Sequence, residues 1–190
     1  MLHSQRIVLQ LLKSALSGAI FSLPANVNWQ EVMDCATEQG VLGVCFGSVE
    51  KLNKNQLPDM HLLMDWLRQV EYLKTQYEEH KNVIRVLSAF YGQHNIKMLL
   101  MKGYGLPLDY LIPKHRPTGD LDIYLFGHKE RADELISNQR GISVDRNYGF
   151  HSRFQLNGVT VENHSQFFDD DRHRSDVRFK RYFLNCLMKM

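Results

Sequence analysis

The spacing of apolar residues changes near Gly92, and this change constrains the fold more than any other feature of the chain. Before Gly92, apolar residues recur every three or four positions, as they do along one face of an α-helix. After it, they come in short runs such as 96–101, which are typical of buried strands. We therefore predict an α+β fold, with a helical N-terminal subdomain over residues 1–91 and an α/β core with a C-terminal helix over residues 92–190.

The helical half contains four segments separated by turn signals. The first helix is expected to end at Gly18. The second is expected to begin after Asn28, an N-cap residue with a glutamate three positions later, and to end before Gly40. A short apolar helix is expected over 41–52. From there, residues 59–91 continue the helical pattern without a breaker, which indicates one long helix or two helices with a bend.

The second half alternates strands and helices. Strands are expected at 96–101, 120–126, 142–144, 151–155 and 159–162. Helices are expected at 104–111, 129–139 and 174–188. Asn157-Gly158 lies between the last two strands and is a strong signal for a β-hairpin turn. The pattern predicts a mixed sheet flanked by helices.

The composition is that of an ordinary folded protein, with 44% hydrophobic and 23% charged residues. A formal net charge of +2 provides no overall basic field for nucleic acid. Three cysteines without a Cys-x-x-Cys pair are interpreted as buried thiols in a reducing compartment. The sequence shows no signal-peptide pattern and no apolar run of the ~20 residues that a membrane helix needs. We expect a cytoplasmic protein without membrane contact.

Residues 119–125 carry the strongest functional signal. Side chains alternate along a strand, so Leu121 and Ile123 would face a core while Asp120 and Asp122 project together from the other face. Two carboxylates one strand repeat apart, roughly 6–7 Å between α-carbons, can bind a divalent metal. Their repulsion costs free energy unless a cation or hydrogen bonds compensate. An Asp-x-Asp at a strand edge also occurs without metal, so the neighbouring features decide.

Those features fit phosphoryl chemistry. Gly103 would let the backbone approach a triphosphate, and the helix predicted after it would offer free amides to that anion. Lys102 and Arg116 could offset phosphate charge, with surface charge or a salt bridge as the alternative. Glu162 on the last strand would complete a site for two Mg²⁺ ions roughly 4 Å apart, with Mn²⁺ as the substitute. An exposed strand residue is the alternative for Glu162.

Three sequence blocks resemble the uncharacterised bacterial nucleotidyltransferase family of the DNA polymerase β-like nucleotidyltransferase superfamily. These blocks are Leu100-Met101-Lys102-Gly103, Arg116-Pro117-Thr118-Gly119-Asp120-Leu121-Asp122-Ile123 and Val159-Thr160-Val161-Glu162-Asn163-His164. The resemblance implies the minimal nucleotidyltransferase fold, in which Asp120, Asp122 and Glu162 are catalytic metal ligands. It implies nucleotide binding by Lys102, Gly103, Tyr104, Arg116 and Gly119. Tyr104 stands where the superfamily pattern has a serine, and His164 is expected to orient a metal ligand.

The expected activity is transfer of a nucleoside monophosphate from a nucleoside triphosphate to a hydroxyl acceptor, with release of pyrophosphate. One alternative is a catalytically degenerate nucleotidyltransferase fold that serves as a binding or antitoxin-like module. Another is an Asp-x-Asp glycosyltransferase, although such enzymes place βαβ units, not ninety helical residues, before the motif. Nucleic acid is a less favoured class of acceptor that basic residues between 172 and 181 keep open.

Overall fold

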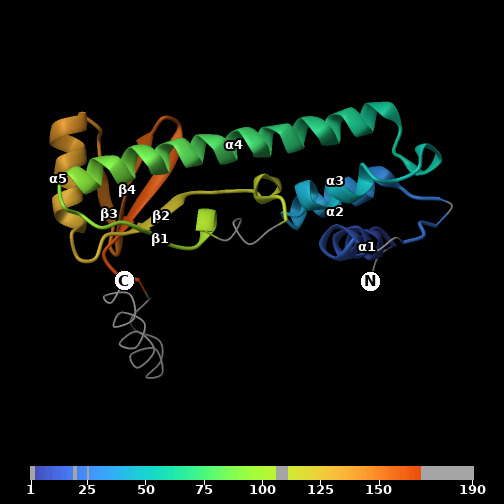
Figure 1. The fold of residues 1–190 in the computed structure, drawn as a ribbon, viewed down its shortest axis with the longest axis horizontal. Helices are drawn as coiled ribbons and strands as arrows, with labels where there is room; N and C mark the ends of the chain where they lie inside the picture. The colour runs from blue at the N-terminus through green and yellow to red at the C-terminus, as the bar shows by residue number, and fades with distance from the viewer. Residues whose placement is uncertain (1–2, 19–20, 25, 106–110, 168–190) are drawn as a thin grey trace, which may run out of the picture. The chain divides into compact units, whose positions relative to one another are not determined.

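The computed structural model describes residues 3–18, 21–24, 26–105 and 111–167 (Figure 1). Over these residues the fold is α+β, with five α-helices and a mixed five-stranded sheet. The chain divides into two compact units, and each is described by itself. The first unit comprises Met1–Asn82 and Gly103–Gly119, and the second comprises Val83–Lys102 and Asp120–Met190.

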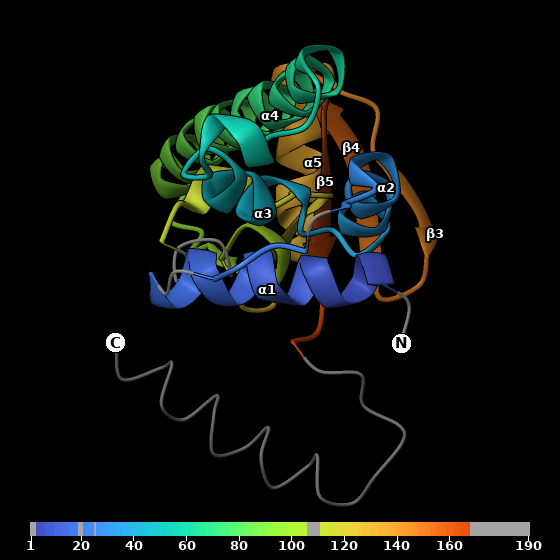
Figure 2. The same cartoon turned by 90° about the vertical axis from the view of Figure 1, so that its right-hand side faces the viewer.

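Helices α1 (His3–Ser17), α2 (Trp29–Glu38) and α3 (Leu42–Val49) pack against one another in the first unit (Figures 1 and 2). The unit also contains the 3₁₀ turn η1 (Lys54–Gln56) and the first part of α4 (Met60–Gln93). Apolar faces of these helices share one core, which includes Ile7, Leu11, Val32, Ala36, Phe46, Trp66 and Val70. The indole nitrogen of Trp66 is satisfied inside this core, because it donates to the Leu42 carbonyl at 3.1 Å.

The predicted helices of the first half are confirmed. The Asn28 side chain caps α2 by accepting a hydrogen bond from the Glu31 amide, and its own amide donates to the Glu31 carboxylate at 2.9 Å. Helix α4 runs unbroken, which selects the single long helix over two helices with a bend. In the described residues, no helix is long and apolar enough to cross a membrane.

The second unit contains the sheet. Its strands are β1 (Leu99–Leu100), β2 (Leu121–Tyr124), β3 (Asp145–Tyr148), β4 (His151–Leu156) and β5 (Val159–His164). They lie in the order β1-β2-β5-β4-β3. The β2–β5 pair is parallel, and the other described pairs are antiparallel. The predicted hairpin between β4 and β5 is confirmed: Asn157 and Gly158 both have positive φ, at 51° and 81°, as a type I′ turn requires.

One face of this sheet is apolar and covered. Its buried side chains include Leu121, Ile123, Phe154, Val159 and Val161. Helix α5 (Lys129–Arg140) packs against β5 on this side (Figure 2). A buried polar cluster joins the helices to the strands. Asp133 of α5 accepts hydrogen bonds from Ser152 at 2.8 Å and Asn163 at 2.9 Å, and Asn163 also donates to the Tyr91 hydroxyl of α4 at 3.2 Å.

The strand predicted at 142–144 is wrong, since the edge strand β3 begins three residues later and is exposed. Gly141 ends α5 in the left-handed conformation, with φ of 65°, and the Ile142 amide bonds back to the Ile136 carbonyl. The apolar residues after the glycine therefore serve the helix C-cap, as they do in Schellman turns. The segment that pairs with β4 is therefore the polar one that follows, Asp145–Tyr148.

Two further predictions differ in extent. The strand predicted at 96–101 pairs at Leu99 and Leu100, because the Ile96 amide closes the end of α4 on the Tyr91 carbonyl. The helix predicted at 104–111 lies largely outside the described residues. Residues 103–105 form a 3₁₀ turn, and η3 (Pro113–His115) follows. The helix predicted at 174–188 and the basic residues between 172 and 181 also lie outside the described residues.

Candidate active site: three carboxylates on the open face of the sheet

Three acidic side chains share the face of the sheet opposite the apolar one. Asp122 in β2 and Glu162 in β5 are register partners on adjacent parallel strands. Because side chains alternate, both project away from the face that buries Leu121 and Val161. Asp120 lies two residues before Asp122, immediately ahead of β2, and is on the same side. Three separate carboxyl groups are thus brought to one region by strand register.

Burial makes this arrangement costly without compensation. The Asp122 and Glu162 residues are 7% and 8% exposed, whereas the Asp120 side chain is 43% exposed. A buried carboxylate loses its hydration, so it needs a cation or hydrogen-bond donors nearby. The described residues supply several such groups, each from a strand or strand end of the same unit.

Arg153 provides the closest compensation. It is the register partner of Glu162 on β4, and its Nη2 and Nε lie 2.6 and 3.1 Å from Glu162 Oε1. The same Nη2 lies 3.3 Å from Asp120 Oδ2. The hydrogen bond to Glu162 raises the pKa of Arg153. Arg153 therefore bridges two of the three predicted metal ligands.

His164 and Lys102 compensate the third carboxylate. His164 Nε2 lies 3.0 Å from Asp122 Oδ1, and Lys102 Nζ lies 3.7 Å from the same oxygen. Burial alone would raise the pKa of Asp122. The hydrogen bond from His164 and the positive charge of Lys102 together outweigh burial and lower that pKa. Asp122 is consequently held in its ionised form.

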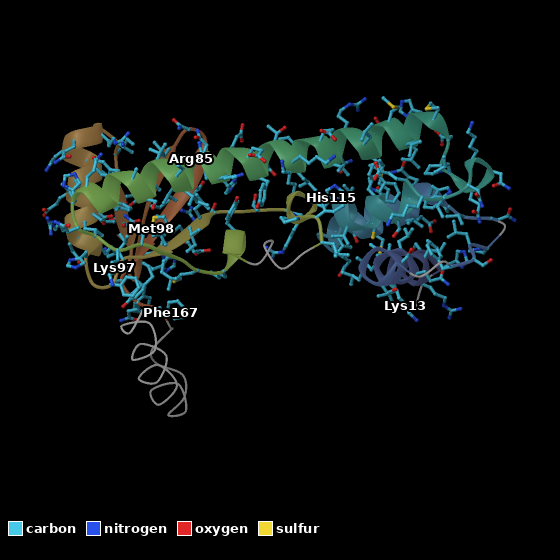
Figure 3. All side chains as sticks on the ribbon, in the orientation of Figure 1. Lys13, Arg85, Lys97, Met98, His115 and Phe167 are labelled. Carbon is cyan, nitrogen blue, oxygen red and sulfur yellow. The ribbon has the colours of Figure 1, made fainter. Side chains whose placement is uncertain are left out.

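A second histidine completes the group around Glu162. His164 Nε2 lies 3.5 Å from Glu162 Oε2, and His151 Nε2 lies 3.6 Å from Glu162 Oε1. A pocket of about 440 Å³ opens beside these rings. It is lined by Met101, Lys102, Phe150, His151, His164, Gln166 and Phe167, the last of which is labelled in Figure 3. The pocket gives solutes access to the histidine side of the cluster.

The remaining predicted residues belong to the first unit. Gly103 has a φ of 71°, which favours glycine, and its carbonyl accepts a hydrogen bond from Arg116 Nη1 at 2.9 Å. The Gly119 carbonyl lies 2.6 Å from His80 Nε2. Tyr104 is buried and stacks on Tyr77, with ring centroids 4.8 Å apart. Nucleotide binding by Gly103, Tyr104, Arg116 and Gly119 stays a prediction.

Reasoning from the sequence did not assign Arg153 a role. The available signal was its period-two relation to His151, together with the hairpin that sets Arg153 opposite Glu162. Counting back from the Asn157-Gly158 turn gives that pairing directly. The hairpin register therefore contained the information that links Arg153 to the acidic centre.

The donor set determines what this centre can hold. Carboxylate oxygens are the ligands that Mg²⁺ and Mn²⁺ prefer. Here three carboxylates share one region of the sheet face, and the positions around them hold an arginine, a lysine and two histidines. The carboxylates already attract four basic side chains of the protein itself. Their negative charge and oxygen donors therefore also fit a divalent cation.

A family model described as an uncharacterised nucleotidyltransferase matches residues 25–188, which is most of the chain. The matched region includes the acidic centre and both flanking strands of the hairpin. No curated protein and no solved structure matches the sequence.

Proposed function

We propose, from the premise that this chain belongs to the uncharacterised nucleotidyltransferase family, that it is a metal-dependent enzyme. It transfers a nucleoside monophosphate from a nucleoside triphosphate to a hydroxyl acceptor, with release of pyrophosphate. The observation that carries this proposal is the in-register pairing of Asp122 with Glu162, with Asp120 on the same face. Family membership gives no support to the Asp-x-Asp glycosyltransferase alternative.

Asp120, Asp122 and Glu162 are the residues that would hold Mg²⁺, with Mn²⁺ as the substitute. When bound, the metal supplies charge stabilisation at the phosphates and lowers the pKa of the attacking hydroxyl. Every proposed ligand atom is a carboxylate oxygen, which suits these cations. The three groups also lie where the protein already concentrates positive charge.

The chain's own residues divide the remaining work. The lowered pKa of Asp122 keeps it ionised at neutral pH and makes it a weak proton acceptor, so we assign it to binding. Glu162 is the proposed acceptor of the hydroxyl proton. Lys102, whose side chain is 71% exposed beside Asp122, is proposed to contact the phosphates. Arg153 occupies one oxygen of Glu162 and one of Asp120, so a cation that binds at these two oxygens would have to displace it.

Labelled nucleoside triphosphates and Mg²⁺, incubated with the purified protein and candidate hydroxyl acceptors, test this proposal. Release of pyrophosphate should require the metal and should disappear in the double variant Asp120→Asn plus Asp122→Asn. The matched control is Glu130→Gln plus Glu134→Gln, which removes two exposed acids of α5 in the same unit and should leave activity unchanged. Metal-dependent transfer that survives the aspartate variant would rule out this mechanism.

The Arg153 contacts favour one other function. An arginine that remains on Glu162 and Asp120 would keep one oxygen of each carboxylate from a cation. The chain would then be a degenerate member of the family that binds a partner. Calorimetric titrations with Mg-ATP and Mg-CTP separate the two functions, because the degenerate module should show no metal-dependent nucleotide binding. A hydroxyl-bearing acceptor and a cytoplasmic location remain part of the enzymatic proposal.

A further inference from the structure

Two histidines flank Glu162 on the open face of the sheet. His151 and His164 are register partners on the antiparallel strands β4 and β5. Their rings therefore come from neighbouring strands on the same side as Glu162, and their centroids lie 5.2 Å apart. The proposed nucleotidyl transfer uses His164 to orient Asp122 but gives His151 no role.

The ligand atoms of these three residues have the spacing of a metal site. One atom from each of His151, Glu162 and His164 lies within 4.8 Å of the others. His151 Nε2 lies 3.6 Å from Glu162 Oε1, and His164 Nε2 lies 3.5 Å from the other carboxylate oxygen, Oε2. In a tetrahedral zinc site the ligand atoms lie about 3.3–3.4 Å apart, given metal–ligand bonds of about 2.0–2.1 Å. The cluster would have to contract from separations of up to 4.8 Å to reach that geometry.

An unsatisfied nitrogen supports a ligand at this point. His151 Nε2 is buried from solvent and has no hydrogen-bond partner among the described residues. Leaving such an atom without a partner is unfavourable, so the fold gains if a ligand binds there. Its position 3.6 Å from a carboxylate oxygen directs the nitrogen toward the centre of the cluster.

The chemistry of the donors selects the kind of metal. Imidazole nitrogens suit Zn²⁺ and other late first-row ions, whereas Mg²⁺ prefers oxygen ligands alone. Two histidines and one glutamate also leave a fourth position for water or a substrate group. The pocket of about 440 Å³ that both histidines line gives that position room and access.

We propose that His151, Glu162 and His164 form a transition-metal site, which overlaps the three-carboxylate centre at Glu162 and takes Zn²⁺ or a similar ion. The two sites share Glu162, so one ion would withdraw that carboxylate from the other. Zn²⁺ would then inhibit the Mg²⁺-dependent reaction by competing for Glu162. Binding at the new site stands independently, and only the inhibition rests on the proposed function.

Cobalt absorption spectroscopy on the untagged full chain tests the site. Co²⁺ is a suitable probe because it reports nitrogen ligation by its visible absorption bands and is displaced by Zn²⁺ at tetrahedral sites. The wild-type protein should bind one Co²⁺. His151→Ala should weaken this binding by more than about tenfold, because even the loss of a group that only orients a metal ligand has an effect of that size. This variant is the cleaner of the two histidine changes, because His151 Nε2 makes no hydrogen bond within the described residues.

Two control variants show whether the bound Co²⁺ is held by the histidines or by the carboxylates. His128→Ala removes an exposed histidine of the same unit and should leave the Co²⁺ spectrum unchanged. Asp120→Asn should also retain Co²⁺ binding, although it should lose Mg²⁺-dependent transfer. Wild-type protein that does not bind Co²⁺, or a His151→Ala variant that binds it equally well, overturns the site. Co²⁺ binding in a protein without transfer activity would instead count against the proposed enzyme and leave this site standing.

Discussion

Arg153 and Glu162 face each other across the β4–β5 ladder, and the 2.6 Å contact between Nη2 and Oε1 is the closest ion pair of the described acidic centre. The guanidinium occupies an oxygen that the proposed reaction needs for a cation. Metal binding through Oε1 and this ion pair are therefore alternatives at Glu162. The energetic balance between them should control the affinity of the centre for Mg²⁺.

Arg153→Met should lower the melting temperature of the metal-free protein and enlarge the stabilisation that Mg²⁺ provides. The first effect arises because Glu162 is left buried without its main counter-ion, and the second because Mg²⁺ no longer competes with Arg153. Differential scanning calorimetry with and without MgCl₂ measures both. Arg131→Met changes an exposed arginine of α5 and serves as the control. An Mg²⁺-induced shift equal to that of the wild type would contradict the competition.

Gly43→Ala should destabilise the first unit by about 1–3 kcal/mol, as overpacking does. A β-carbon at this position of α3 would overlap the backbone carbonyl oxygen of His115 and lie 3.0 Å from its carbonyl carbon. His115 belongs to η3, which packs on α3 (Figure 3). Chemical denaturation measures the change in the free energy of unfolding.

Gly47→Ala is the matched control for Gly43→Ala, because it lies one helical turn later on the same helix. Its nearest neighbour outside α3 would be His115 Nδ1 at 4.0 Å, an ordinary contact. The alanine should therefore stabilise the helix by about 0.5–1 kcal/mol. Equal effects of the two substitutions would show that α3 does not approach the His115 backbone as described.

His115 should make the stability of the first unit fall as the pH decreases. Burial, reinforced by the charge of Lys74, lowers the pKa of His115 below its ordinary value of 6.5, against weaker opposing effects from Gly43, Glu50 and Glu71. The unfolded chain then binds the proton more readily than the folded one. The contribution of neutral His115 to the free energy of unfolding is complete above pH 6.5, and it is lost as the pH falls through the pKa of the folded state.

His115→Gln tests this sign by removing the titrating group. Between about pH 7.5 and about pH 5.5, the wild-type protein should lose more unfolding free energy than the variant does. Urea denaturation at both pH values supplies the comparison. His61→Gln, a change at a 90% exposed imidazole, should keep the wild-type pH dependence. A variant that loses as much stability as the wild type would show that His115 is not the group responsible.

Asp133→Ala should destabilise the second unit by about 1–3 kcal/mol, the usual cost of leaving buried donors without a partner. Both Ser152 and Asn163 donate to the Asp133 carboxylate, and all three residues are fully buried. Asp133→Asn retains an acceptor oxygen and should lose less. Thermal denaturation of the two variants orders them, and an alanine variant as stable as the wild type would contradict the role given to this cluster.

Local patterns predicted the parts of the site that depend on one strand at a time. Side-chain alternation placed Asp120 with Asp122, and it separated Glu162 from Val161, because the period of two is a property of the extended backbone itself. Those geometric expectations agree with the structure. The catalytic and metal-binding roles of the three acids stay predictions.

The contacts between strands could be identified only from the structure. Neither the parallel pairing of β2 with β5 nor the bridge from Arg153 to Asp120 follows from spacing along the chain. The repulsion expected between the Asp120 and Asp122 carboxylates calls for a counter-ion that their own strand does not contain. Arg153 supplies that counter-ion, so Asp120→Asn should bring little gain in stability.

Parallel pairing has a consequence for assembly. Strands β2 and β5 are neighbours in the sheet although α5, β3 and β4 lie between them in the chain, so their pairing closes a long loop. A partly folded intermediate that lacks this closure holds each acid on a separate segment, with no high-affinity chelate. High cation affinity would therefore require this closure, and an ion that binds only the closed state should slow unfolding more than it speeds folding.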